Sequence, residues 1–79
     1  MFRHIKDYIT DNEFRVNLFN DSVNIINYCK IITIEKSRIS LSYTDGILII
    51  KGDDLALKKM LDNEVLICGL IKSIELERI

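Results

Sequence analysis

The sequence predicts an all-β domain of about seven or eight short, mostly antiparallel strands in a curled, sandwich-like meander. Segments rich in Val and Ile recur at steps of roughly eight residues and are separated by Asn, Asp, Ser and Gly, a rhythm typical of sandwiches and barrels. In the clearest segments apolar and polar residues alternate with a period of two. A solenoid is a less favoured alternative, because the sequence contains only one weak internal repeat, between Ile-Ile-Lys-Gly and Leu-Ile-Cys-Gly.

The N-terminal segment, residues 1–12, has a different period. Phe2, Ile5, Tyr8 and Ile9 follow i, i+3 and i+4 spacing, which places them on one side of a short helix. The polar residues 10–12 would end that helix. We therefore expect a helical N-terminal segment over residues 1–12 and a single β domain over residues 13–79.

The first strand is expected to begin at Phe14, where the period changes to two. Phe14, Val16 and Leu18 then point to one face of a sheet. A turn is expected over residues 20–22, whose short polar side chains can bond to the local backbone. Residues 22–43 are rich in β-branched residues and divide into three strands.

The last of these three strands gives the strongest alternation in the sequence. Polar and apolar residues alternate strictly here, in the order Arg38, Ile39, Ser40, Leu41, Ser42 and Tyr43. This alternation gives the strand one apolar face, expected to be buried, and one polar face, expected to contact solvent. The sequence Thr-Asp-Gly at residues 44–46 follows it and predicts an antiparallel hairpin over residues 37–51, with Gly46 supplying a positive φ.

The second arm of this hairpin, residues 47–50, is apolar on both faces, so it is either a central strand or part of an interface. Residues 55–61 are ambiguous between a short strand and a helical turn capped by Asp54, and local propensity favours the helix. Residues 65–68 are again apolar on both faces, and Gly69 predicts a bend or bulge before a separate last strand containing Ile74 and Leu76.

The size and composition of the chain point to association with other proteins. A chain of 79 residues that is 48% hydrophobic has little interior of its own, so it must expose apolar surface or bury it against a partner. The strands that are apolar on both faces give the candidate interface residues, which are Ile47, Leu48, Ile49, Ile50, Val65, Leu66 and Ile67. We expect a homodimer whose interface contains these strands.

The residue types needed for catalysis or for a resident cofactor are scarce. His4 is the single histidine, and it lies near a terminus, where an exposed side chain without a function is the commoner case. Cys29 and Cys68 have no zinc spacing and are interpreted as buried apolar residues of a protein in a reducing compartment. Asp53 and Asp54 are interpreted as a solvated turn and helix cap. We expect no enzyme activity, no cofactor and no metal site.

The charge and hydropathy of the chain exclude further classes of protein. The formal net charge is -1 with both signs scattered, so no basic field for nucleic acid is present. No window reaches the length of a membrane span and no secretory signal is visible, so a cytoplasmic location without direct membrane insertion is expected.

The run from residue 23 to residue 76 resembles the YabP/YqfC family of bacterial sporulation proteins, and is more similar to the YqfC branch. The resemblance is carried by the isoleucine-rich hairpin closing on Gly46, by Leu-Ile-Ile-Lys-Gly at residues 48–52, by Leu-Ala-Leu at residues 55–57 and by Glu-Val-Leu-Ile-Cys-Gly at residues 64–69. It implies a β-rich homodimer that is made during endospore formation and takes part in assembling the spore coat or envelope through protein contacts, in the mother cell or at the developing spore surface. Its partners would be other sporulation or coat proteins. No catalytic or binding residues come with the resemblance.

Two mechanisms of protein contact remain open at this level. The apolar strands could form a two-fold interface, or the domain could be a small β-barrel adaptor whose free edge captures a strand of a client protein. Binding of single-stranded nucleic acid ranks lower, since the six aromatic residues are not interleaved with a basic groove. Those aromatics are Phe2, Tyr8, Phe14, Phe19, Tyr28 and Tyr43.

Overall fold

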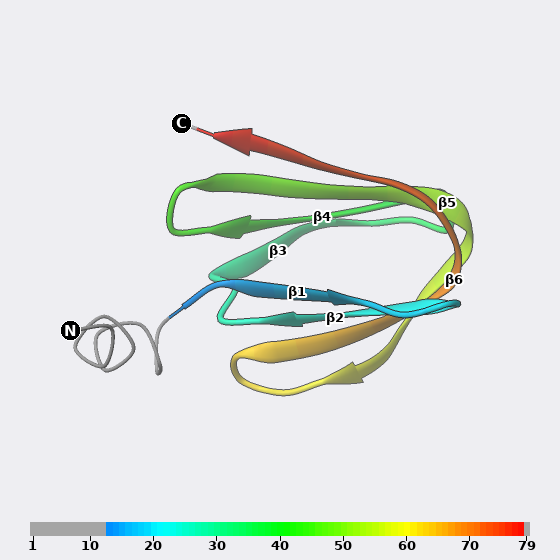
Figure 1. Cartoon of the computed structure of the whole chain (residues 1–79), viewed down its shortest axis with the longest axis horizontal. Coiled ribbons are helices and arrows are strands. Elements are labelled where there is room, and N and C mark those ends of the chain that lie inside the picture. The colour runs from blue at the N-terminus through cyan, green and yellow to red at the C-terminus, as the bar shows by residue number, and fades with distance from the viewer. Residues whose placement is uncertain (1–12, 79) are drawn as a thin grey trace, which may run out of the picture.

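Residues 13–78 form six antiparallel strands in one sheet, in the order β1-β2-β6-β5-β4-β3 (Figure 1). The structure is a computed structural model, and it describes residues 13–78. The strands are β1 (Arg15–Leu18), β2 (Ser22–Ile26), β3 (Lys30–Ile34), β4 (Arg38–Tyr43), β5 (Gly46–Met60) and β6 (Glu64–Arg78). The all-β prediction is confirmed for these residues. The helix expected over residues 1–12, and His4 within it, lie outside them.

The strand count is lower than predicted because β5 and β6 are each 15 residues long and continue through the positions that looked like breaks. Gly69 was expected to separate two strands, but it lies inside β6. The ladder between β5 and β6 shifts register at Lys51/Gly52, at Asp53/Ala56 and at Leu57/Lys59. Such bulges bend a strand and increase its twist without ending it. The long strands therefore turn a corner, and Figure 1 shows both folding back at the same end of the molecule.

This corner folds the sheet into two layers that face each other. One layer contains β3, β4 and the parts of β5 and β6 that pair as Gly46–Lys51 with Ser73–Arg78. The other contains β1, β2 and the remaining halves of the long strands, with β2 paired along Glu64–Cys68. The predicted sandwich-like curl is thus made by bending one sheet.

Backbone hydrogen bonds from two turns fix the corner. The Ser37 carbonyl accepts from the Gly52 amide at 3.1 Å, and the Lys36 carbonyl accepts from Leu55 at 2.8 Å. On the β1–β2 side the Asp21 carbonyl accepts from the Gly69 amide at 3.1 Å. Gly69 has φ 135°, which side chains rarely adopt, and a Cβ there would lie 2.7 Å from the Asp54 carbonyl oxygen. Glycine is therefore required at this point of β6.

The helix favoured for residues 55–61 is wrong, because β5 continues to Met60. Leu57 pairs with Ile67 and Met60 with Val65, so strand pairing with β6 overrides local helix propensity. Asp54 is not a helix cap. It is exposed in the corner bulge and has φ 53°, a conformation that Asp tolerates better than most side chains.

The hairpin predicted over residues 37–51 is confirmed, since Tyr43 pairs with Gly46 across a turn at Thr44 and Asp45. The reason given for the glycine is wrong, because Gly69 is the glycine with a positive φ among the described residues. A Cβ on Gly46 would instead collide with the backbone carbonyl of Glu77 in β6. Close approach of two strands thus selects glycine at this position.

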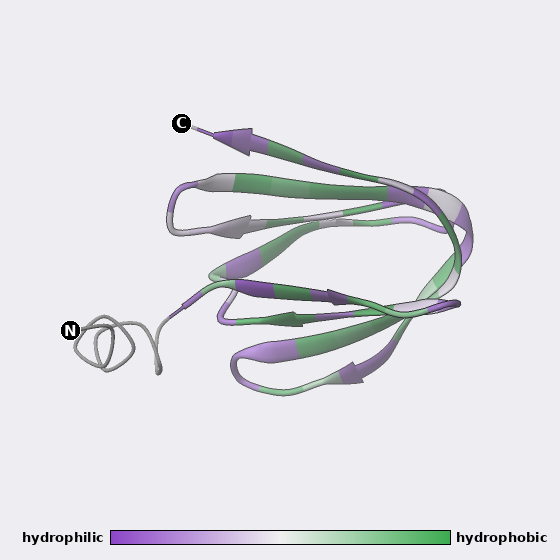
Figure 2. Cartoon of the chain, viewed as in Figure 1, coloured by the Kyte–Doolittle hydropathy of each residue, from purple (hydrophilic) through white to green (hydrophobic). Residues whose placement is uncertain are grey.

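The core lies between the two layers and is lined from both. β4 supplies Ile39, Leu41 and Tyr43, as their alternation predicted, and the other core residues are Val23, Ile25, Leu48, Ile50, Leu55, Val65 and Ile67. Figure 2 shows hydrophobic residues along the β5 and β6 segments that line this space. The segments that are apolar on both faces belong to β5 and β6, which occupy the middle of the sheet.

Candidate protein-contact surfaces

Most of the candidate interface residues lie in the interior of the fold. Leu48, Ile50, Val65 and Ile67 are fully buried between the layers, and Ile49 is 6% exposed. Ile47 and Leu66 are half-buried and alternate with these core residues, so they lie on the outer faces. Ile47 and Leu66 are therefore the predicted interface residues that a partner protein can contact in this fold. Their role in an interface stays a prediction.

Free strand edges form the next class of candidate surface. β1 and β3 are the end strands of the sheet. The Ala56–Met60 part of β5 lies beyond its pairing with β4, and the Ser73–Arg78 part of β6 lies beyond its pairing with β2. Each of these edges leaves backbone amide and carbonyl groups without a strand neighbour on one side within residues 13–78.

Three of the edges carry features that discourage pairing with another chain. β1 has 4 residues, and β3 has a register shift between Ile31 and Thr33. The free part of β5 has a shift between Leu57 and Lys59 and carries the exposed pair Lys58 and Lys59. Short length, bulges and lysines are the devices that natural sheets use to protect an edge.

The β6 edge, defined here as residues Ser73–Arg78, differs from the other three. It pairs with Lys51–Gly46 in an unbroken register, so its free side is a regular strand edge. Ile74 and Leu76 pair with the buried residues Ile50 and Leu48 and therefore lie on the core side. Leu76 is nevertheless 51% exposed, because no strand of residues 13–78 continues the sheet beyond it.

The outer face of the β6 edge is acidic. Glu75 and Glu77 alternate with Ile74 and Leu76 and are exposed. The carboxylate of Glu75 lies 3.5 Å from the Lys51 ammonium group, whereas Glu77 has no ion-pair partner among the residues that the structure describes. The edge thus presents an apolar side to the core and a negatively charged side to solvent.

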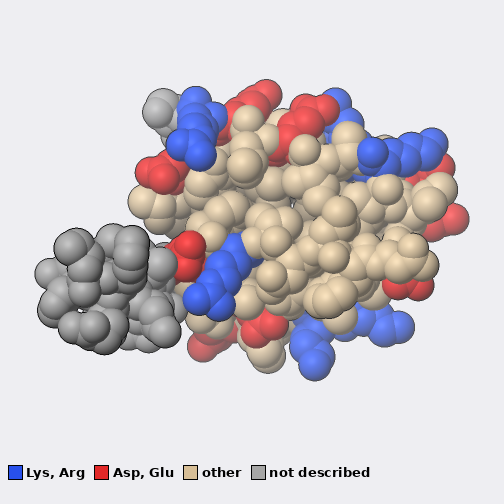
Figure 3. Space-filling model, in the orientation of Figure 1, with Lys and Arg blue, Asp and Glu red and all other residues tan. Residues whose placement is uncertain are grey.

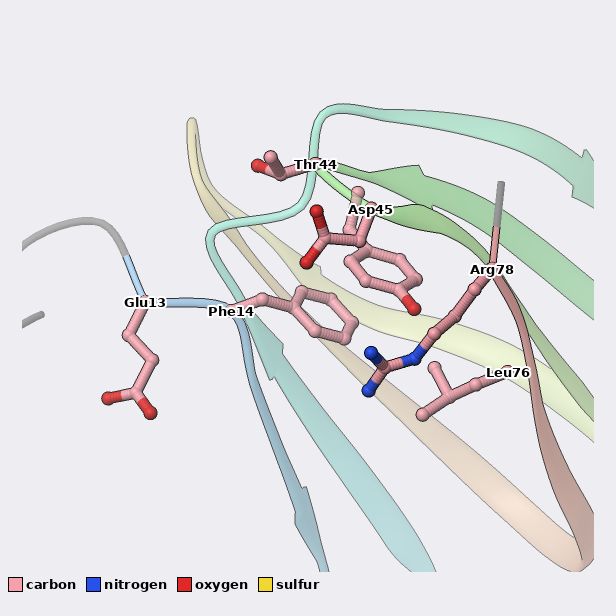
Figure 4. A pocket seen from close by; sticks show the side chains of 7 residues that line it. Glu13, Phe14, Thr44, Asp45, Leu76 and Arg78 are labelled. Carbon is pink, nitrogen blue, oxygen red and sulfur yellow. The ribbon is translucent and has the colours of Figure 1, made fainter.

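A cleft of about 380 Å³ adjoins the end of the β6 edge (Figure 4). Phe14 and Tyr43 stack in it, with ring centroids 4.1 Å apart and an interplanar angle of 12°. Tyr43 is 8% exposed, and its hydroxyl group is buried without a hydrogen-bond partner among residues 13–78. Figure 4 shows the Arg78 side chain extending towards Phe14 beside Leu76. The remaining lining residues are Glu13, Thr44 and Asp45.

A second cleft of about 250 Å³ adjoins the start of the β6 edge. One wall is formed by Leu18, Phe19 and Asn20, and the other by residues 71–74 of β6. Leu18 and Phe19 are 61% and 56% exposed. β1 or its flanking residues therefore form one wall of both clefts, and β6 forms the other. Figure 3 shows the face of the molecule that is turned to the viewer in Figure 1. The centre of this face is largely uncharged, and charged residues lie around its rim.

Phe14, Tyr43, Leu76 and Arg78 were not singled out as site residues from the sequence. The sequence places Phe14 and Tyr43 on the apolar faces of two predicted strands, and Leu76 in the last predicted strand. Their significance depends on the strand order, which leaves the end of β6 without a second strand neighbour in the described part of the chain. No local sequence signal marks that position.

The remaining chemical groups in the described part of the chain are separated from one another. Cys29 is exposed and Cys68 half-buried, both with free thiols, so the prediction that both are buried is wrong. Asp53 is exposed and forms an ion pair with Lys72 at 2.9 Å. Within residues 13–78, no group of His, Cys, Asp and Glu side chains is arranged to hold a metal ion. Nor do these residues include a helix with the length and apolar character to cross a membrane.

Residues 13–78 define a small all-β domain in which one bent sheet encloses the core and no strand of this range covers a regular edge that lies between two clefts. The YabP family model matches residues 11–78, which is nearly the whole chain. The chain therefore belongs to the YabP family. No curated protein and no solved structure matches it.

Proposed function

We propose that this chain is a non-enzymatic sporulation protein of the YqfC branch, which takes part in assembling the spore coat or envelope through homodimerisation and contacts with other proteins. The observation that carries this proposal is the YabP family match over residues 11–78. The partners would be a second copy of the chain and other sporulation or coat proteins, with no nucleic acid. The proposed location is the mother-cell cytoplasm or the developing spore surface, without insertion into a membrane.

The distribution of apolar side chains supports a role based on protein contact. After the core has formed, eight large hydrophobic residues remain at least half exposed in the described part of the chain. They are Leu18, Phe19, Ile32, Ile34, Met60, Leu61, Leu70 and Leu76. Exposed apolar residues that gather beside open strand edges are typical of surfaces that bind other proteins.

Homodimerisation is part of the same proposal. Because most of the predicted interface residues are buried in the core, fewer of them remain available for a dimer interface than the sequence suggested. Ile47 and Leu66 are the half-buried, outward-facing members of the predicted set, and Ile32 and Ile34 are exposed on the end strand β3. A two-fold interface over either surface would cover apolar area that the chain leaves open to water. Sedimentation velocity over a range of concentrations measures the oligomeric state directly.

The coat-assembly proposal is tested in a sporulating host that lacks this gene. Thin-section electron microscopy of the spores should show an altered coat or envelope, and expression of the intact chain should restore it. A variant with Leu48→Asp serves as the control for loss of folded protein, because Leu48 is fully buried. Spores of normal ultrastructure and resistance in the deletion strain would contradict the proposal.

A second candidate function is favoured by the β6 edge. An unbroken strand edge with an apolar cleft at each end suits an adaptor that captures an extended segment of a client protein. This function is compatible with homodimerisation, since β3 and the outer faces of the sheet remain available. The chemistry of such a client segment is considered next.

A further inference from the structure

We infer that the β6 edge binds an extended segment of a partner protein as an added strand, and that this segment alternates apolar residues with Lys or Arg. The inference rests on the proposed function in one respect, that the protein works through contact with other proteins. It goes beyond that function in naming the edge, the two faces of the bound strand and a side-chain pocket at one end.

The backbone of the β6 edge supplies the first part of the argument. Residues 73–78 stay in register with residues 51–46, so the free side presents its amide and carbonyl groups at regular strand spacing. A strand that adds to such an edge gains main-chain hydrogen bonds whatever its sequence. The bulges in β3 and in the second half of β5 break this regularity at two of the other edges.

The two faces of the edge define what the added strand must carry. On the core side, the new strand would cover Ile74 and Leu76 and would lie against Phe14 and Leu18, the β1-side walls of the two clefts. Apolar side chains fit there because they would close this side of the core. On the outer side, its residues would face Glu75 and Glu77, where Lys or Arg form favourable cross-strand pairs.

The buried hydroxyl group of Tyr43 points to a specific feature of the bound segment. A buried phenol without a hydrogen-bond partner is unfavourable, and few such groups occur in native structures. Tyr43 lines the cleft of about 380 Å³ at the Leu76–Arg78 end of the edge, which has room for a large side chain. A partner residue with an apolar body and a hydrogen-bonding group at its end, such as Tyr or Gln, would fill this cleft and pair with the hydroxyl.

A second copy of the chain fits the β6 edge less well than a basic partner. In an antiparallel two-fold pair, opposing residues lie on the same face of the sheet. The registers nearest the middle of the edge are centred on Glu75 or on Leu76. The first places Glu75 opposite Glu75, and the second places Glu75 opposite Glu77. Like charges directly opposite each other destabilise strand pairing.

The test uses the full chain and two labelled peptides of about ten residues, long enough to cover a strand edge. In the first peptide Val alternates with Lys, and one Tyr replaces a Val near the end expected over Tyr43. In the second peptide each Lys is replaced by Glu. Fluorescence anisotropy should show the lysine peptide binding at least about tenfold more tightly, because Lys side chains on its outer face lie beside Glu75 and Glu77, whereas glutamates at the same peptide positions are repelled. Equal binding of the two peptides would overturn the inferred partner chemistry.

Two variants of the chain locate the binding. The double variant Glu75→Lys/Glu77→Lys should reverse the preference between the peptides, and the matched variant Lys58→Glu/Lys59→Glu at the β5 edge should leave it unchanged. Amide hydrogen exchange should show new protection within residues 73–78 on binding. Protection that appears on β3 instead, with no change in residues 73–78, would overturn the assignment to β6.

Other occupants of the edge give distinct results. If the amides of residues 73–78 that face away from β5 are already protected in the free chain, and the variant Ile5→Asp/Ile9→Asp exposes them, the occupant is the chain's own N-terminal segment and the inference is wrong. If the protection rises with protein concentration, the occupant is a second copy and the inference is equally wrong. A failure of peptide binding in a protein whose deletion still alters the spore would reject this inference and leave the proposed function standing.

Discussion

Phe14 and Tyr43 stack across the open end of the bent sheet, with their ring centroids 4.1 Å apart. Phe14 immediately precedes β1 and Tyr43 ends β4, so the stack joins the two layers at the end opposite the corner. Offset aromatic stacking contributes about 0.5–1.5 kcal/mol beyond the burial of the rings. The same stack forms part of the cleft beside Leu76 and Arg78.

The substitution Tyr43→Phe is expected to raise the free energy of unfolding by about 1 kcal/mol, because it removes a buried hydroxyl group that has no partner. It should simultaneously weaken binding of the tyrosine-containing lysine peptide. Urea unfolding followed by circular dichroism checks the first effect and anisotropy the second. Phe14→Leu is the control, since it removes the stack and should lower stability. A destabilised Tyr43→Phe variant would show that the hydroxyl is hydrogen-bonded in solution.

Leu48→Lys and Leu66→Lys are expected to separate core residues from surface residues. Leu48 is fully buried, so a lysine there should unfold the chain, at a cost of more than about 4 kcal/mol. Leu66 is half-buried on an outer face, so its variant should remain folded. Sedimentation of the Leu66→Lys protein then reports on the dimer, because a monomer would assign Leu66 to the interface. A folded Leu48→Lys protein would contradict the position of the core.

Gly69→Ala is expected to destabilise the protein by about 2 kcal/mol or more, because alanine is strained at φ 135°. The added Cβ would also lie 2.7 Å from the Asp54 carbonyl oxygen. Ser73→Ala, on the same strand beyond the corner, should change stability by less than about 0.5 kcal/mol. Thermal unfolding of both variants measures the difference. Equal stability of the two proteins would mean that the corner does not need the glycine.

Asp54→Gly is expected to be neutral or to stabilise the protein by up to about 1 kcal/mol, since Asp54 has φ 53° and glycine adopts this conformation without a steric penalty. Asp54→Val should lower the free energy of unfolding by about 1–2 kcal/mol, because a β-branched side chain is poorly accommodated there. Urea unfolding of the two variants checks the order. If valine is tolerated as well as glycine, the corner bulge differs from the one described here.

Much of the fold follows from local sequence. The alternation of Ile39, Leu41 and Tyr43 predicted the buried face of β4, and the Thr44–Asp45 turn predicted its pairing with β5. The length of β5 and β6 did not follow, because Gly52, Asp54 and Gly69 carry the same local signal whether they end a strand or bend it. Helix propensity in residues 55–61 was likewise overridden by pairing with β6.

The candidate surfaces were harder to predict than the fold. Apolar residues on both faces predicted that segments 47–50 and 65–68 would lie either in the middle of the sheet or in an interface. The sequence did not distinguish these two alternatives, and the strand order places both segments in the middle of the sheet. The β6 edge depends on β2 pairing with Glu64–Cys68, so that no strand within residues 13–78 covers Ser73–Arg78 on that side. That pairing joins segments far apart in the chain, and nothing in either segment alone specifies it.

The central position of β6 has a consequence for folding during synthesis. β6 leaves the ribosome after the other five strands described here, yet β2 pairs with it directly and β1 is attached to the sheet through β2. The β1–β2 hairpin therefore cannot join the sheet until β6 has been synthesised, and until then its apolar face stays exposed to water. Nascent chains stalled before Glu64 should consequently be sensitive to proteases and should bind chaperones.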